Sequence, residues 1–92
     1  MSEKDDMRIV SLLARSERRI KVLKLLENED KIPSRISKEI EDNSNHVSKY
    51  LKSLKEAELV KCLNEDDKRY RYYSITNKGK YYLDKVEKDY KD

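Results

Sequence analysis

The chain has 92 residues, of which 36% are hydrophobic and 45% are charged, and its net charge is +3. This length predicts one domain with a modest core, and the periodic spacing of its apolar residues argues against disorder. The small net charge does not by itself indicate a nucleic-acid partner. A single cysteine, Cys62, excludes an internal disulfide and a multi-cysteine metal site. No apolar run is long enough to span a membrane, so we expect a cytoplasmic protein.

The first predicted helix runs from about Asp5 to Ala14, and residues 1–4 are expected to be disordered. Its apolar residues Met7, Val10 and Leu13 lie near helical spacing. Such a stripe packs either on the rest of the domain or on a second copy of the chain.

A second helix is predicted from Glu17 to about Glu27, with Ser16 as its N-cap. It is apolar over most of its circumference and should be central to the core. Arg18 and Arg19 lie near its start, against the preference of the helix dipole. They are expected to form salt bridges to the N-terminal acidic residues or to contact phosphate.

Residues 33–57 have the pattern of a helix-turn-helix. Pro33 suits the first turn of one helix, and a polar turn leads to Asn43, a candidate N-cap of the next. In that next helix four apolar residues recur at i, i+3, i+4 and i+7, which defines one buried face. They are Val47, Tyr50, Leu51 and Leu54. The opposite face carries short polar side chains and lysines, with no acidic residue between Asn43 and Lys55. Short polar groups can reach base edges and lysines can reach phosphates, although an ordinary amphipathic surface helix has the same pattern.

Residues 59–75 are predicted to form a two-stranded ribbon, with Tyr73 and Ile75 facing the core. Its turn is acidic at Glu65, Asp66 and Asp67, and Arg69 and Arg71 follow. Ile32 is a candidate for a further short strand. Residues 76–91 are predicted to form a last helix, and Thr76 can cap it.

This series of elements resembles the winged-helix transcriptional regulators of the prokaryotic ArsR and MarR families. The opening core helix resembles ArsR-type proteins from Ser16 to Leu26. The helix-turn-helix spacing matches from Ile36 to Leu54, and Asp67-Lys68-Arg69 followed by Ile75-Thr76 is similar to a MarR-type wing. No single motif is specific, but the series stays in register over most of the chain. The chain departs from the family at Glu41 and Glu58, where glycine is usual, and at Asp42, where an apolar residue is usual.

The resemblance implies a mainly α fold with a small β-wing, in which residues 1–92 form one winged helix-turn-helix domain. It implies that the recognition helix enters the major groove and that the wing touches backbone or minor groove. The residues implied to bind DNA are Ser44, Asn45, His46, Ser48, Lys49, Lys52, Arg69 and Arg71. The first and last helices would form the dimer interface. The residues implied for it are Met7, Val10, Leu13, Tyr82, Leu83, Val86 and Tyr90. The paired cysteines of ArsR-type metal sensors are absent, so neither a metal site nor a cofactor is expected.

Some single residues allow more than one interpretation. His46 could contact a base or phosphate, act as a pH switch or metal ligand, or simply fill surface. Cys62 fits a small core residue better than a redox sensor. Tyr70, Tyr72 and Tyr73 either pack the ribbon or stack on nucleotides. Catalysis has no support, because no nucleophile with a base and no phosphate-binding glycine loop is present.

The sequence therefore predicts a homodimeric transcriptional regulator, associated with the nucleoid, that binds double-stranded DNA sequence-specifically. Two alternatives stay open. One is a winged helix that serves as a protein-interaction module of a larger assembly, and the other is an architectural protein that binds DNA without sequence preference. Whether a small-molecule effector exists is unknown from the sequence.

Overall fold

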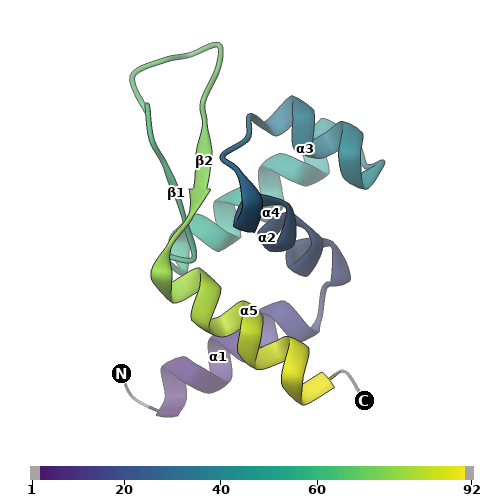
Figure 1. Cartoon of the computed structure of the whole chain (residues 1–92), viewed down its shortest axis with the longest axis vertical. Coiled ribbons are helices and arrows are strands. Elements are labelled where there is room, and N and C mark those ends of the chain that lie inside the picture. The colour runs from purple at the N-terminus through teal and green to yellow at the C-terminus, as the bar shows by residue number, and fades with distance from the viewer. Residues whose placement is uncertain (1–2, 91–92) are drawn as a thin grey trace.

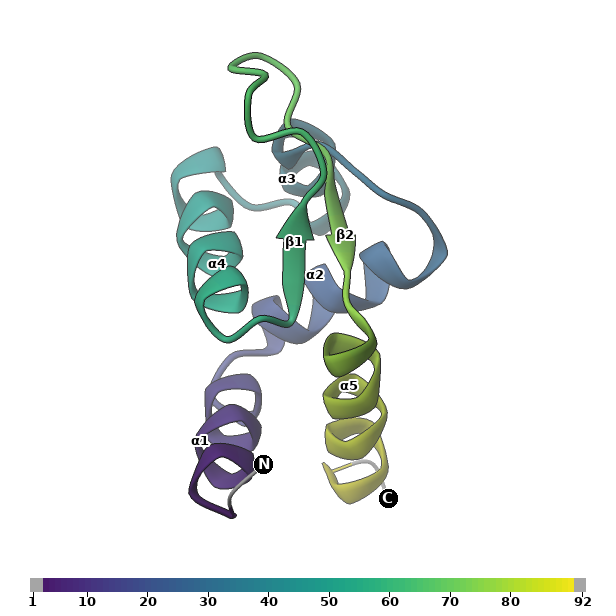
Figure 2. The same ribbon diagram turned by 90° about the vertical axis from the view of Figure 1, so that its left-hand side faces the viewer.

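The computed structural model describes residues 3–90, and the side chains of residues 5–88. The elements in this part of the chain are α1 (Glu3–Ala14), α2 (Glu17–Asn28), α3 (Pro33–Ile40), α4 (Ser44–Glu56), β1 (Val60–Cys62), β2 (Tyr73–Ile75) and α5 (Asn77–Tyr90). Figures 1 and 2 show two ends of the molecule, with α1 and α5 at one end and α3, α4 and the β1–β2 hairpin toward the other. Helix α2 lies between them and packs on α1, α3, α4 and α5. No helix in the described part is long and apolar enough to cross a bilayer.

The helix boundaries agree closely with those expected from the sequence. Helix α1 begins at Glu3 rather than Asp5, while residues 1 and 2 lie outside the described residues. Helix α5 covers 77–90 of the expected 76–91, and residue 91 also lies outside them.

Three predicted N-caps form the expected hydrogen bonds. Ser16 Oγ accepts from the backbone N–H of Arg19 at 3.3 Å, and Asn43 Oδ1 accepts from that of His46 at 2.9 Å. Thr76 Oγ1 accepts from the backbone N–H of Gly79 at 2.9 Å. Each cap satisfies an N–H group that would otherwise lack a partner in the first helical turn, which explains why these helices begin where they do.

Helices α3 and α4 both end in a Schellman motif whose left-handed residue is a glutamate. Glu41 has φ 55° and Glu58 has φ 64°. After α3, the N–H of Asp42 donates to Ser37 O at 3.0 Å, and after α4 that of Leu59 donates to Leu54 O at 2.9 Å. Glycine is the usual residue at such positions because a side chain there is strained. The glutamates thus occupy the two positions at which the resemblance noted in the sequence leads us to expect glycine.

The core lies where α2 meets the other helices and the base of the hairpin. Leu13, Val22, Leu23, Ile36 and Leu59 are among its fully buried members. Gly79 of α5 is also buried, against the Leu59 backbone. The helix-turn-helix therefore rests on α2, and the hairpin is held at its base by the start of α5.

The hairpin is shorter than predicted, because only Val60–Cys62 and Tyr73–Ile75 are strands. They pair antiparallel, with Cys62 opposite Tyr73. Beyond the strands, the Asn64 side chain forms the hydrogen bonds across the hairpin. Its Oδ1 accepts from Tyr72 N and its Nδ2 donates to Tyr70 O, both at 2.7 Å. The far part of the wing is thus a loop whose two sides are joined in part by the Asn64 amide.

The other edge of β2 is bridged by the segment between α2 and α3. Lys31 N donates to Tyr73 O at 3.1 Å, and Tyr73 N donates to Lys31 O at 2.8 Å. The extra strand expected at Ile32 is therefore a single bridge one residue earlier. The Lys31 side chain is only 6% exposed, and its ammonium pairs with Glu29 and Glu39 at 2.9 Å each. These hydrogen bonds raise the pKa of Lys31, the one to Glu29 most.

Four residues predicted for a dimer interface are instead core residues of one chain. Leu13, Tyr82, Leu83 and Val86 are at most 2% exposed, because α1 packs on α5 of the same chain. A hydrophobic stripe predicts that a helix is covered but not what covers it, and here the partner is intramolecular. Met7 and Val10 remain accessible, and the side chain of Tyr90 lies outside the described residues.

Candidate nucleic-acid interface

Helix α4 presents a polar face to solvent. Val47, Leu51 and Leu54 are buried against the core, and this fixes the rotation of the helix about its axis. The polar residues predicted to contact DNA are all exposed: Ser44, Asn45, His46, Ser48, Lys49 and Lys52. The first acidic residue of α4 is Glu56, in its last turn. The face is therefore cationic or neutral along most of its length.

The turn before α4 does not present its Asp42 carboxylate to solvent. The Asp42 side chain is 12% exposed. Its Oδ1 lies 2.8 Å from His46 Nδ1 and accepts from the backbone N–H of Asn43, also at 2.8 Å, while Oδ2 accepts from Tyr50 Oη at 3.0 Å. The hydrogen bond to His46, followed by those from Tyr50 and Asn43, lowers the pKa of Asp42. An apolar side chain commonly packs at this position of such turns. Here the Asp42 carboxylate occupies it and is held by polar contacts.

Two arginines of α2 hold this helix-turn-helix in position. Arg18 donates to the carbonyl of Ile40 at 2.8 Å and lies 3.9 Å from Asp42. Arg19 donates to Ser53 Oγ of α4 at 3.0 Å and to the Leu12 carbonyl of α1 at 3.2 Å. These contacts, with α3, α4 and the Leu12 carbonyl, differ from the salt bridges to N-terminal acidic residues that the sequence led us to expect. Arg18 caps the end of α3, and Arg19 joins α1 to α4.

Asp67 holds the wing tip together by hydrogen bonds, and its carboxylate is engaged by backbone N–H groups of the tip itself. The Asp67 carboxylate accepts the backbone N–H groups of Arg69 and Tyr70 at 2.7 and 3.0 Å, and its carbonyl accepts from Arg71 Nε at 3.0 Å. The bond from Tyr70 N–H, followed by that from Arg69, lowers the pKa of Asp67. The predicted contact residues Arg69 and Arg71 are both exposed.

A second acidic residue of the wing is paired with the end of α4. Glu65 forms an ion pair with Lys55, and this contact lowers the pKa of Glu65 and raises that of Lys55. The acidic turn is therefore largely engaged within the protein.

The structure brings the two sets of predicted DNA contacts to the same end of the molecule. In Figures 1 and 2 the tip of the wing and the start of α4 both lie at the end away from α1 and α5. Sequence reasoning missed the roles of Asp42, Arg18 and Lys31. Asp42 carried one usable signal, since an acidic residue stands where an apolar one is usual.

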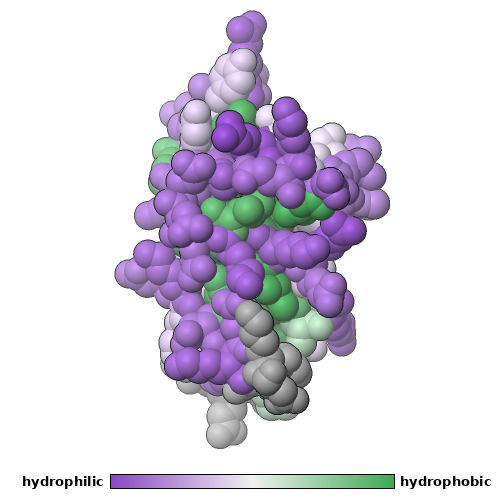
Figure 3. All heavy atoms as spheres, turned by 45° about the vertical axis from the view of Figure 1, so that its right-hand side comes forward, coloured by the Kyte–Doolittle hydropathy of each residue, from purple (hydrophilic) through white to green (hydrophobic). Residues whose placement is uncertain are grey.

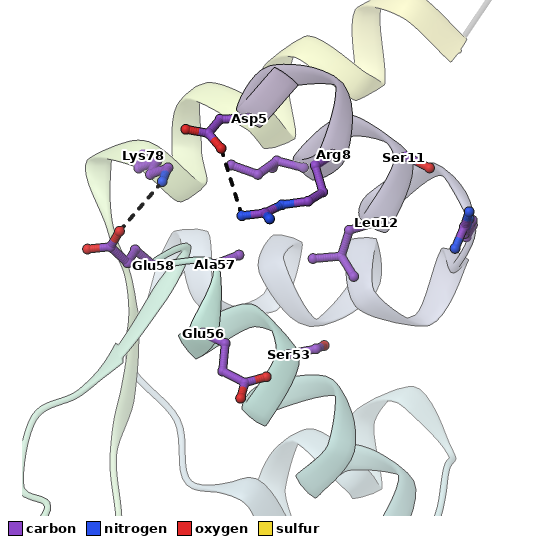
Figure 4. Close-up of a pocket in the computed structure, with 11 residues that line it drawn as sticks. Asp5, Arg8, Ser11, Leu12, Ser53, Glu56, Ala57, Glu58 and Lys78 are labelled. Atoms are coloured by element: carbon purple, nitrogen blue, oxygen red, sulfur yellow. Dashed lines mark ion pairs between the residues drawn. The ribbon is translucent and has the colours of Figure 1, made fainter. Parts of the chain in front are cut away.

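A mixed-charge groove of about 480 Å³ lies between α1 and the junction of α4 with the wing. Figure 4 shows Leu12 and Ala57 beside two ion pairs, Asp5–Arg8 and Glu58–Lys78, each at 3.8 Å. Its charges are thus partly paired within the chain. Within the part of the chain that the structure describes, no three His, Cys, Asp or Glu side chains are grouped so that they could hold a metal ion.

A model of the winged helix-turn-helix family matches residues 15–91. With the fold described above, this shows that the chain belongs to the winged helix-turn-helix family. No protein of curated function matches the sequence.

Several solved structures have the same fold. The transcriptional regulator BldR from Sulfolobus solfataricus superposes with a TM-score of 0.75 at 18% identity, covering 94% of this chain and 63% of that one. The domain Mb0332 from Mycobacterium bovis, described as homodimeric, DNA-binding and possibly of the ArsR family, gives 0.73 at 23% identity, covering 97% and 88%. ZitR from Lactococcus lactis, a zinc-responsive MarR family member, gives 0.66 at 26% identity, covering 82% and 58%. The chain thus spans little more than half of ZitR and under two thirds of BldR. The predicted fold is confirmed.

Proposed function

We propose that this protein is a transcriptional regulator that binds double-stranded DNA sequence-specifically as a homodimer. The observation that carries the proposal is the exposed face of α4, which holds seven exposed polar or cationic side chains ahead of its first acidic residue. A helix of this kind fits the major groove, with its N-terminal residues at base edges. Lys49, Lys52, Arg69 and Arg71 would contact phosphates, and Ser44, Asn45, His46 and Ser48 would contact bases.

The dimer surface is proposed at the end formed by α1 and α5. Met7 is 72% exposed and Tyr81 is 55% exposed, and a shallow groove of about 400 Å³ is lined by Met7, Val10 and Lys85 among others. Figure 3 shows hydrophobic residues at the surface in the lower half of the molecule, where α1 and α5 lie. A two-fold dimer would place two α4 helices about 34 Å apart and favour a pseudo-palindromic site. The homodimeric state described for Mb0332 supports this arrangement.

Salt-dependent binding tests the DNA assignment. Lys49→Ala and Arg69→Ala should each weaken binding to a selected DNA site. In a dimer each substitution removes two phosphate contacts, so the slope of log K against log salt should become shallower by roughly 2. Lys21→Ala is the matched control, because Lys21 is an exposed cation of α2 outside the proposed DNA contacts and dimer surface. An unchanged slope in both Lys49→Ala and Arg69→Ala, or the same change in Lys21→Ala, would contradict the assignment.

Oligomeric state tests the dimer separately. Met7→Glu should convert a dimer to a monomer in sedimentation equilibrium, because it brings like charges into an apolar contact. Lys21→Glu on the exposed side of α2 should leave the dimer intact. A wild-type chain that is monomeric at high concentration contradicts the proposal.

One observation favours the alternative of a protein-interaction module. Leu63, Tyr70 and Tyr72 of the wing are exposed apolar or aromatic residues, and such patches mark interaction sites. That alternative predicts no salt-dependent binding to any duplex. An architectural protein would instead bind with a steep salt slope but equally well to selected and random duplexes.

A further inference from the structure

The side chain of His46 is held at one ring nitrogen by the turn that precedes its helix. Asp42 Oδ1 lies 2.8 Å from His46 Nδ1, and the same carboxylate is bound by Tyr50 from α4 and approached by Arg18 from α2. The low exposure of Asp42 and these contacts from two helices fix the carboxylate in place. The His46 ring therefore has a defined anchor at Nδ1.

The chemistry of the carboxylate determines which ring nitrogen carries the proton. An ionised carboxylate can only accept hydrogen bonds, so Nδ1 must donate to it. In a neutral imidazole one nitrogen is a donor and the other an acceptor. With Nδ1 as the donor, Nε2 is an acceptor.

The acceptor nitrogen is the one left for an outside partner. The His46 side chain is 53% exposed, and no hydrogen bond to Nε2 occurs among the residues that the structure describes. His46 is the third residue of α4, in the first turn, from which recognition helices contact base edges. The ring thus presents one acceptor atom from the predicted contact face.

In the major groove, acceptor atoms are matched by a small set of donors. Adenine offers N6 and cytosine offers N4, whereas guanine N7 and O6 and thymine O4 are acceptors. An acceptor at Nε2 pairs with adenine or cytosine and is repelled by the acceptor edges of guanine and thymine.

We propose that Asp42 is a positioning residue that fixes His46 in its Nδ1–H tautomer, so that His46 Nε2 accepts from the amino group of an adenine or a cytosine. The inference deepens the proposed function, and its base contact rests on that function. The tautomer of His46 is a property of the free protein and can be tested without DNA.

Long-range proton–nitrogen NMR of the imidazole tests the tautomer, and the same spectrum reports whether the ring is neutral. At alkaline pH, where the ring is neutral, wild-type His46 should be predominantly Nδ1–H. Asp42→Ala should lose this preference. Tyr50→Phe is the control, because it removes another hydrogen bond to the same carboxylate but leaves the one to His46. A wild-type ring that is mainly Nε2–H, or a preference unaffected by Asp42→Ala, overturns the inference.

Selection from a random duplex library tests the base contact. Wild type and Tyr50→Phe should enrich adenine or cytosine at one position of each half-site. His46→Ala keeps the backbone N–H that Asn43 caps, so its fold should be retained, but its preference at that position should fall by about fivefold or more. Asp42→Ala should lose the same preference and no other.

The outcomes distinguish a failure of the base contact from a failure of DNA binding. If His46→Ala selects the same base as wild type, the base contact is refuted while DNA binding stands. If wild type enriches no sequence, the proposed function fails and the base contact with it, and the NMR result still decides the tautomer. If Asp42→Ala does not fold, the wild-type tautomer and the His46→Ala selection decide the inference.

Discussion

The Cα atom of Gly79 in α5 lies against the backbone carbonyl of Leu59 at the base of the wing. A Cβ atom at Gly79 would lie 2.2 Å from Leu59 O and 2.7 Å from Ile75 Cγ1. The first of these neighbours is backbone, which cannot rotate away. The absence of a side chain at Gly79 is what lets the last helix pack closely on the hairpin.

Gly79→Ala should therefore destabilise the protein although alanine favours helices. Overpacking that forces the backbone to shift costs about 1–3 kcal/mol. Urea unfolding should show a lower midpoint. Lys80→Ala, at the exposed next position, should change stability by at most about 0.5 kcal/mol. Equal midpoints for Gly79→Ala and wild type would contradict the close contact.

Replacing either left-handed glutamate with glycine should stabilise the protein. A non-glycine residue with positive φ costs roughly 1–2 kcal/mol in the folded state. Glycine removes this strain, but it also gives the unfolded chain more conformational entropy, which offsets part of the stabilisation. Glu41→Gly and Glu58→Gly should each gain about 0.5 kcal/mol, because the side chain of Glu58 is 81% exposed and its ion pair to Lys78 is weak.

The matched control for the glycine variants is Glu56→Gly, within α4. It should lose about 1 kcal/mol, since helical φ gives glycine no advantage. Differential scanning calorimetry of the three variants measures the contrast. Loss of stability in all three would show that Glu41 and Glu58 have no strain to relieve.

Stability at acid pH should depend on Asp42. Its pKa is lowered in the folded state, first by the hydrogen bond to His46. Because the folded pKa is the lower one, the ionised Asp42 carboxylate stabilises the fold above the ordinary aspartate pKa near 4. This stabilisation is lost as pH falls through the lower folded value. Urea midpoints between pH 5 and pH 2 should fall less steeply for Asp42→Asn than for wild type. Asp66→Asn at the exposed wing tip should retain the wild-type slope.

Tyr82 should titrate late at alkaline pH. Its hydroxyl donates to Asp6, and this bond together with burial raises the pKa of Tyr82 to about 12. Since the folded pKa is the higher one, the stabilisation is complete below pH 10 and is lost as pH rises toward 12. The tyrosinate absorbance of wild type minus Tyr82→Phe should have its midpoint near 12. A midpoint near the ordinary value of 10 would show that the hydroxyl is free.

The sequence predicts most of the local structure because its signals are local. Ser16, Asn43 and Thr76 mark helix starts by side-chain bonds to N–H groups three residues on, and such bonds depend little on the rest of the fold. The α4 face was predictable for the same reason, since Val47, Leu51 and Leu54 fix it by their spacing.

Most of the missed features depend on contacts between separate elements of the fold. Tyr82 has the spacing of an interface residue but meets Asp6 of its own chain. Arg19 binds Ser53, which is 34 positions away. Asp42 is a charged residue at a turn position that is usually apolar, and it is accommodated there by contacts with His46, Tyr50 and Arg18. None of these partners can be read from periodicity.

The paired hydrogen bonds between Lys31 and Tyr73 have a mechanical consequence. They join the segment leading into α3 to the strand leading out of the wing, and the largely buried Lys31 ammonium adds pairing to Glu39 of α3. The wing base and the helix-turn-helix are thereby joined by direct bonds before any ligand binds. The conformational entropy of these joined segments is lost when the protein folds, so less of it remains to be lost on association. A partner that engages both the wing and the helix-turn-helix must therefore match the angle between them that folding sets.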